Sequence, residues 1–160
     1  MAAAARGDIG SSPLATPLAV LGNTVFAGNE AGMLARYALP DLQPAAEIPL
    51  GSRVSWGPHV LSDGLLIATE AEELLMVGQD GAVRWRQKLA HGQPAGAPIV
   101  EGDAALVLYA ASGLARFKLA DGAELSFVEL GQPAIEGPTS MGQRLILTAP
   151  DGALLVVNRP

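Results

Sequence analysis

Short apolar runs, separated by Gly, Pro, Asn and Asp, follow one another along the whole chain. One stretch shows the order well: Pro98 opens an apolar run, Gly102-Asp103 follow, a second run covers 105–109, and a third begins at Gly113. Each run has the length of a strand, and Gly with Asp or Asn tolerates the backbone conformations of tight turns. The pattern therefore predicts short antiparallel strands joined in a meander.

This order of runs recurs four times. Four prolines occupy the same place in the copies, at intervals of 41, 40 and 40 residues: Pro17, Pro58, Pro98 and Pro138. A period of about 40 residues made of four strands is typical of propeller blades, because one small sheet buries both faces only when neighbouring sheets stack on it. No window keeps the apolar spacing of a helix. A β-sandwich with a similar number of strands is the alternative fold.

The sequence predicts an all-β protein: a β-propeller, or a propeller segment, of four four-stranded antiparallel blades in one domain, 1–160. The expected blades are residues 11–51, 52–92, 93–131 and 132–160. The fourth copy lacks its last strand. Residues 3–10 resemble the end of the first copy, and we expect them to close the last blade as its outermost strand. The continuously apolar runs 65–68 and 106–108 are expected to be buried on both faces.

Composition narrows the classes of function. Apolar residues make up 49% of the chain and charged residues 16%, as in globular proteins. The net charge is −6 and no cluster of Lys and Arg occurs, so binding to nucleic acid or to an anionic membrane surface is not expected. The apolar runs are too short for membrane insertion. The first ten residues have no apolar core of signal-peptide length, so we expect either a cytosolic protein or a mature or excised piece of a longer chain. The absence of cysteine excludes disulfides and thiolate chemistry.

The sequence indicates no catalytic residue, metal ligand or cofactor. The Asp residues beside Gly are explained by the turns that they form. Two histidines, His59 and His91, are too few for a tri-histidine metal site. No serine elbow and no phosphate-binding glycine loop occurs. We therefore expect a protein that is not an enzyme.

A binding surface is expected where one copy departs from the others. In a meander, the loop before the first strand and the loop between the second and third strands emerge at the same end of a blade. In the second copy these loops are 52–56 and 70–73, whereas the other copies have mostly Ala, Gly, Ser and Pro there. The candidate partner-binding residues are Arg53, Trp56, Glu70, Glu72, Glu73 and His91. Trp56 is either an exposed binding anchor or a residue that packs between blades.

The repeating unit resembles the repeat of pyrroloquinoline-quinone-type (PQQ-like) propellers. The resemblance rests on a Pro followed by apolar residues, a Gly-Asp or Asp-Gly turn, an apolar strand, a second Asp-Gly turn and Val83-Arg84-Trp85. Trp85, in the second copy, is the Trp of that pattern. Such propellers usually have seven or eight blades. The resemblance thus leaves three arrangements: a closed ring of four blades, a half-ring that forms a homodimer with eight blades, or a fragment of a larger ring.

The resemblance is compatible with two classes of function. The same repeat occurs in quinone-dependent dehydrogenases and in non-catalytic scaffolds such as the outer-membrane assembly lipoprotein. We expect a non-enzymatic scaffold that binds a protein partner through its loop face, and the resemblance implies a periplasmic or exported location. The alternatives are part of a PQQ-dependent dehydrogenase, for which no quinone-binding motif can be assigned, and a structural subunit of a larger complex.

Overall fold

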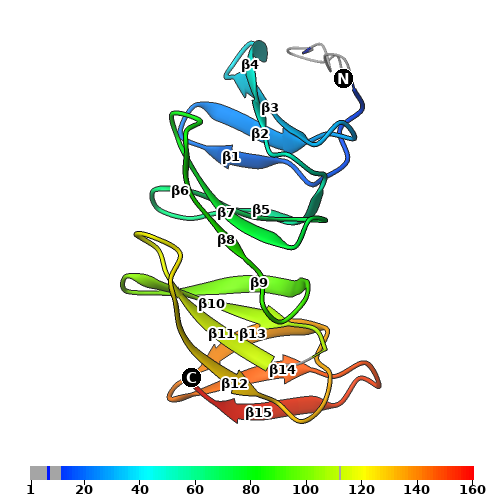
Figure 1. The fold of residues 1–160 in the computed structure, drawn as a ribbon, viewed down its shortest axis with the longest axis vertical. Coiled ribbons are helices and arrows are strands. Elements are labelled where there is room, and N and C mark those ends of the chain that lie inside the picture. The colour runs from blue at the N-terminus through cyan, green and yellow to red at the C-terminus, as the bar shows by residue number, and fades with distance from the viewer. Residues whose placement is uncertain (1–6, 8–11, 112) are drawn as a thin grey trace. The chain divides into compact units, whose positions relative to one another are not determined.

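The computed structural model describes residue 7 and residues 12–111 and 113–160. The chain divides into two compact units, Met1–Arg84 and Trp85–Pro160, and each unit is described by itself. The described residues form fifteen strands (Figure 1). In chain order the strands are β1 (Ala19–Leu21), β2 (Thr24–Gly28), β3 (Met33–Ala38), β4 (Gln43–Pro49), β5 (Val54–Val60), β6 (Gly64–Thr69), β7 (Glu73–Gly78), β8 (Val83–Lys88), β9 (Pro94–Glu101), β10 (Ala104–Tyr109), β11 (Gly113–Lys118), β12 (Glu124–Glu129), β13 (Glu136–Met141), β14 (Arg144–Thr148) and β15 (Leu154–Asn158).

Four consecutive sheets confirm the predicted meanders. Three have four strands each, in the orders β1-β2-β3-β4, β5-β6-β7-β8 and β9-β10-β11-β12, and the last has the order β13-β14-β15. Within the described residues the last sheet thus has three strands rather than four. Residues 3–6 and 8–10, expected to supply the missing strand, lie outside the described residues, so that pairing stays a prediction. Gly7 itself lies against Tyr37 and Leu42 in the first unit.

The second strand of each complete repeat is apolar along its length. All six residues of β6 and all six of β10 are buried. This confirms the expectation that these runs are covered on both faces, because a strand without polar alternation has no side suited to water. The described residues include no helix long and apolar enough to cross a membrane.

Three of the four repeating prolines lie inside strands, which corrects the expectation that they open them, whereas Pro17 precedes β1. Pro58, Pro98 and Pro138 are internal to β5, β9 and β13. In all three strands the pairing register shifts next to the proline. A proline has no N–H to donate to a ladder, so it is tolerated where the ladder is interrupted by a bulge. The run of apolar residues after each proline shows only the second half of the strand.

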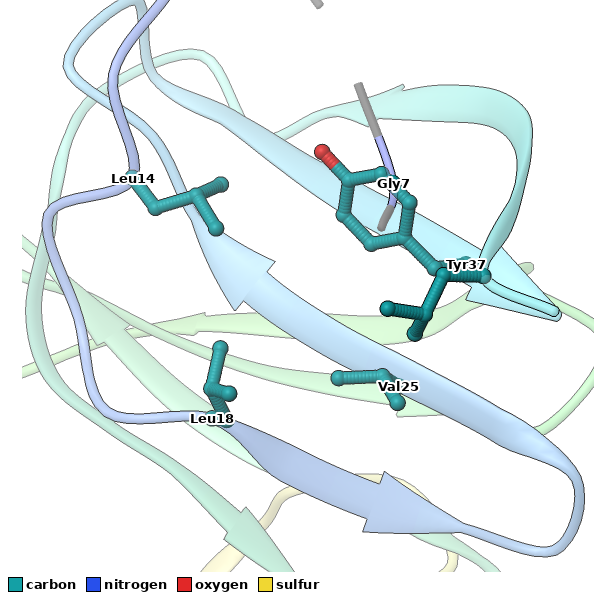
Figure 2. A pocket seen from close by; sticks show the side chains of 6 residues that line it. Gly7, Leu14, Leu18, Val25 and Tyr37 are labelled. Atoms are coloured by element: carbon teal, nitrogen blue, oxygen red, sulfur yellow. The ribbon is translucent and has the colours of Figure 1, made fainter. Parts of the chain in front are cut away.

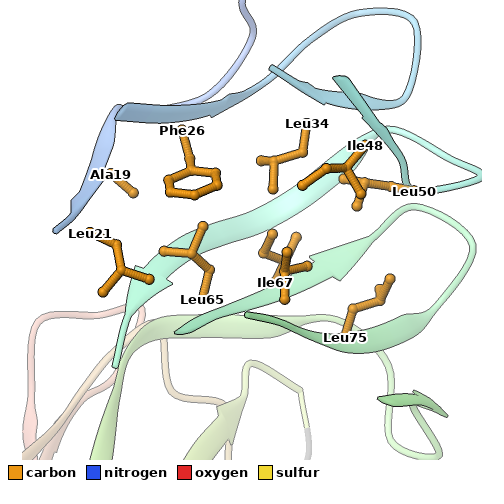
Figure 3. Packing of buried hydrophobic residues seen from close by; sticks show 10 residues of the cluster. Ala19, Leu21, Phe26, Leu34, Ile48, Leu50, Leu65, Ile67 and Leu75 are labelled. Atoms are coloured by element: carbon orange, nitrogen blue, oxygen red, sulfur yellow. The ribbon is translucent and has the colours of Figure 1, made fainter. Parts of the chain in front are cut away.

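In the first unit, one hydrophobic cluster joins the sheet of β1–β4 to that of β5–β8. Figure 3 shows side chains from the two sheets pointing toward one another. The first sheet contributes its leading face, the side turned toward the next repeat, with Ala19, Leu21, Phe26, Leu34 and Ile48. The following sheet contributes its trailing face, the opposite side, with Leu65, Ile67, Leu75 and Val77.

The second unit repeats this arrangement 80 residues later in the chain. The leading face of the sheet β9–β12 provides Leu106, Leu108 and Leu114, all of which are buried. The trailing face of the sheet β13–β15 provides Leu145, Leu147, Leu155 and Val157. Both units therefore stack a leading face on a trailing face, and the same strand positions are used in each.

Polar bonds to Asp-Gly turns accompany this stacking. In the first unit the Arg36 guanidinium donates a 2.9 Å hydrogen bond to the carbonyl oxygen of Asp80. In the second unit the indole N–H of Trp85 donates to the carbonyl oxygen of Leu119, and the Gln87 amide donates to that of Asp121. Gly81 and Gly122 in these turns have positive φ angles of 88° and 74° and leave room for Arg36 and Trp85.

Candidate functional site

Two loops of the second repeat meet at one end of its sheet, as expected from the sequence. The backbone N–H of Glu70, after β6, donates a 2.8 Å hydrogen bond to the carbonyl oxygen of Arg53, just before β5. Arg53 also lies 4.0 Å from the Glu70 carboxylate, measured from Nε to Oε1. The structure therefore brings together two of the predicted partner-binding residues.

A third side chain, Glu30, completes this group and was missed by the sequence analysis. Its Oε2 lies 2.5 Å from Nη2 of Arg53. The side chains of Glu30, Arg53 and Glu70 are 45%, 47% and 54% exposed, so all three are open to solvent. Glu30 stands 40 residues before Glu70, in the equivalent loop of the first repeat. The binding surface was expected from the loops of the second repeat, and the structure adds a charged residue from the first. The repeat register was the signal that could have found Glu30.

Glu72 takes an unusual backbone conformation in the same loop. Its φ is +58°, in the left-handed region that favours glycine. The equivalent positions of the first and fourth repeats are Gly32 and Gly152, with φ of +73° and +85°. A residue with a side chain is strained there by about 1 kcal/mol. The side chain of Glu72 is exposed, and Glu73, which follows it, begins β7 and is half-buried.

Trp56 does not have the exposure expected of a binding anchor. The residue is 8% exposed and lies within β5. Its ring is 4.1 Å from the His59 ring, centroid to centroid, at an interplanar angle of 52°. Burial lowers the pKa of His59, whose Nε2 is buried and has no hydrogen-bond partner. The two rings pack on each other, and the interpretation of Trp56 as an exposed anchor is wrong.

His91 belongs to the second unit, where it has an aromatic environment of its own. Its ring stacks on Phe127 at a centroid distance of 3.7 Å and an angle of 8°. The edge of Tyr109 faces it at 5.3 Å. Its Nε2 is 3.2 Å from Oε1 of Glu124. His91 was expected in a loop, but no pattern in the sequence indicated these three neighbours, because they come from β10 and β12 and meet only through sheet pairing.

Tyr109 is the buried member of this group. It is 0% exposed, and its hydroxyl oxygen has no hydrogen-bond partner. Burial, and to a lesser degree the negative charge of Glu124, raise the pKa of its phenol. Around the aromatic group, as elsewhere in the described residues, no three His, Cys, Asp or Glu side chains gather closely enough to hold a metal ion.

Solved structures with the same architecture include designed and natural propellers. The computationally designed Ika4 protein has a TM-score of 0.79 at 12% identity, with coverage of 100% of this chain and 99% of Ika4. BamB from Moraxella catarrhalis has a TM-score of 0.68 at 16% identity, over 86% of this chain and 43% of BamB. BBS1N, solved in complex with ARL6DN, has a TM-score of 0.71 at 16% identity, over 90% of this chain and 47% of BBS1N.

These likenesses confirm the predicted all-β propeller fold. The chain spans less than half the length of the BamB and BBS1N chains. A sequence search of curated proteins finds no match. A family model described as outer membrane protein assembly factor BamB matches residues 34–158, which is most of the chain. The match confirms the PQQ-like repeat that the sequence indicated, and the chain belongs to this BamB family of repeat propellers.

Proposed function

We propose that this chain is a non-enzymatic propeller scaffold that binds a protein partner through the loops around Arg53. The observation that carries the proposal is the exposed group of Glu30, Arg53 and Glu70, in which loops of two consecutive repeats are joined by ion pairs at one end of the first unit. Loops held at the end of rigid sheets are where propellers and other scaffolds place their binding residues.

The strained Glu72 supports a functional role for this loop end. Backbone strain at an exposed acidic residue, where two other repeats have glycine, lowers stability without an evident packing benefit. Glu72 adds a third exposed carboxylate beside Glu30 and Glu70, against the single guanidinium of Arg53. The surface is acidic, as is the whole chain at −6. A basic segment of a partner protein is therefore the favoured ligand.

Trp56 and His91 receive different roles from those first expected. Trp56 is left out of the proposed contact surface, because it is buried and packs on His59. His91 stabilises the aromatic group of the second unit through Phe127 and Glu124. The proposed contact residues are Arg53, Glu70, Glu72 and Glu73 from the original set, with Glu30 added.

The comparisons support the proposal at the level of the class of protein. BamB is described as an assembly factor, and BBS1N was solved in complex with another protein, ARL6DN. Both are statements about those proteins. This chain covers less than half of each of those proteins. We therefore infer the kind of partner from the surface of this chain alone.

A comparison of matched variants tests the site. The immobilised chain would capture proteins from an extract of its source cells, and bound proteins would be quantified by mass spectrometry. We expect a protein with a basic segment to bind wild type and to be lost with the Glu30→Ala, Glu70→Ala, Glu72→Ala triple variant, with weaker binding at high salt. The control is Glu129→Ala, an exposed position on β12. Equal capture by the triple variant and the control would contradict the proposed surface.

The dehydrogenase alternative has its own direct test. The purified chain would be incubated with pyrroloquinoline quinone and calcium, and binding would be followed by calorimetry. Tight stoichiometric binding would overturn the non-enzymatic proposal, whereas no binding under conditions in which a known quinoprotein binds would be the expected result.

A further inference from the structure

The two terminal sheets each have one apolar face that no other sheet of their own unit covers. On the sheet β13–β15 this is the leading face, with Ile146, Leu154 and Val156 on one side according to the strand register. Leu154 is 69% exposed and Val156 is 51% exposed. The equivalent of Leu154 one repeat earlier is Leu114, which is 0% exposed because the next sheet of the unit packs on it. The last repeat therefore keeps an interior residue at a position that is open.

The first sheet has the complementary trailing face uncovered. Its buried part is Val25, Ala35 and Tyr37, with Leu14 and Leu42 packed beside them. Leu18 and Val20 on the same side are 65% and 52% exposed. Figure 2 shows the side chains of Leu14, Leu18, Val25 and Tyr37 lining one pocket. The pocket has a volume of about 130 Å³, and Gly7 and Leu42 also line it. Val25 and Tyr37 occupy the strand positions that Leu65 and Val77 use to pack on a leading face.

An exposed apolar sheet face favours association with another surface. Terminal repeats normally present polar outer faces, because an uncovered apolar face lowers solubility and invites association. On the leading face, the last repeat is more apolar than the repeat before it at one position, since Val156 stands where the earlier repeat has Arg116. The same chain thus carries an open leading face and an open trailing face, the two surfaces that pack together inside each unit.

We propose that a second copy of this chain covers both faces, with the leading face of β13–β15 in one copy packed on the trailing face of β1–β4 in the other. Two such contacts, related by a two-fold axis, form a closed dimer of eight sheets.

Sedimentation of the 160-residue chain and of two face variants tests the dimer. The wild type is expected at twice the mass of one chain. Leu154→Lys on the leading face and Leu18→Glu on the trailing face each place an unpaired charge in both contacts, and each is expected to raise the dimer dissociation constant at least about a hundredfold. Leu125→Lys, at a residue of β12 that is 52% exposed, is the control and should remain dimeric. Circular dichroism would verify that all variants are folded.

Mixing the two charged variants gives a second, independent measurement. A mixed dimer has one unaltered contact and one contact in which the lysine introduced by L154K faces the glutamate introduced by L18E, so mixing is expected to restore dimers. Because the chain has no cysteine, Val20→Cys and Val156→Cys chains can also be joined by a bis-maleimide, and crosslinks between the two different variants should predominate. A wild type with the mass of one chain, a dimer insensitive to both charged variants, or assemblies that grow beyond two copies would each overturn the proposal.

Discussion

The indole N–H of Trp85 donates a 2.7 Å hydrogen bond to the carbonyl oxygen of Leu119, in the segment that leads to the Asp121-Gly122 turn. The two residues are 34 positions apart and lie in consecutive repeats. Trp85 is nearly buried, so the carbonyl that it satisfies is shielded from water. The tryptophan that the sequence shows in one repeat alone therefore has a structural role in joining that repeat to the next.

Trp85→Phe is expected to lower the free energy of unfolding by about 1–3 kcal/mol, because the ring still packs but the Leu119 carbonyl loses its donor. Gln87→Ala is the control. It removes an exposed 3.2 Å bond to Asp121 in the same turn and should cost no more than about 1 kcal/mol. Denaturant unfolding measures both. Equal losses in the free energy of unfolding would show that the hydrogen bond of the indole N–H contributes no more to stability than that of Gln87.

Gly122→Ala tests the close approach between the turn and Trp85. A Cβ at Gly122 would lie 2.5 Å from Cε3 of Trp85, and the φ of +74° is unfavourable for alanine. Gly102→Ala is the matched control, since Gly102 has a φ of +60° and no atom within 4 Å of its Cβ position. The control should lose about 1 kcal/mol from backbone strain alone, and Gly122→Ala should lose clearly more. Because Cγ of Gln87 would also lie 2.7 Å from a Cβ at Gly122, a Trp85→Ala, Gln87→Ala background should remove most of the difference between them.

Glu72→Gly is expected to raise the free energy of unfolding by up to about 1 kcal/mol, because glycine adopts the observed φ of +58° without strain. Glu70→Gly, in the same loop without a positive φ, should instead lower stability through backbone entropy. Thermal unfolding of the two variants gives the comparison. Destabilisation by Glu72→Gly would mean that the side chain compensates for its backbone, against the proposal that it is retained for binding.

The burial of His59 is expected to make the free energy of unfolding depend on pH. Because burial lowers its pKa below 6.5 in the folded chain, the unfolded chain binds more protons once the pH falls to this range. The contribution of neutral His59 to stability is thus present above pH 6.5 and is lost as the pH decreases below it. Unfolding of wild type and His59→Gln at pH values of about 7.5 and 5.5 should show a smaller decrease for the variant. Identical decreases would contradict this account.

Much of the fold could be predicted because it depends on repetition. The recurring prolines and Asp-Gly turns indicated where each of the consecutive sheets lies in the sequence. The uninterrupted apolar runs indicated β6 and β10, which are inner strands of their sheets. The starts of β5, β9 and β13 were missed. Proline seemed to open a strand, whereas the bulge beside Pro58 or Pro98 lets the strand begin several residues earlier.

The candidate site was predictable only in part. Arg53 and Glu70 could be paired because the meander brings their two loops to one end. Glu30 had the same position in its own repeat, but its ion pair with Arg53 depends on the stacking of two sheets, which a single repeat does not show. The burial of Trp56 depends in the same way on packing around its sheet, which its local sequence does not encode.

The bonds to the Asp-Gly turns also differ from one repeat to the next. The first repeat presents Arg36 to the turn at Gly81, while the second presents Trp85 to the turn at Gly122. The long, narrow side chain of an arginine and the wide indole ring of a tryptophan need differently shaped neighbours. The copies are therefore not interchangeable: shuffling or duplicating one of them, in evolution or by engineering, requires that each side chain and the turn that receives it be moved together.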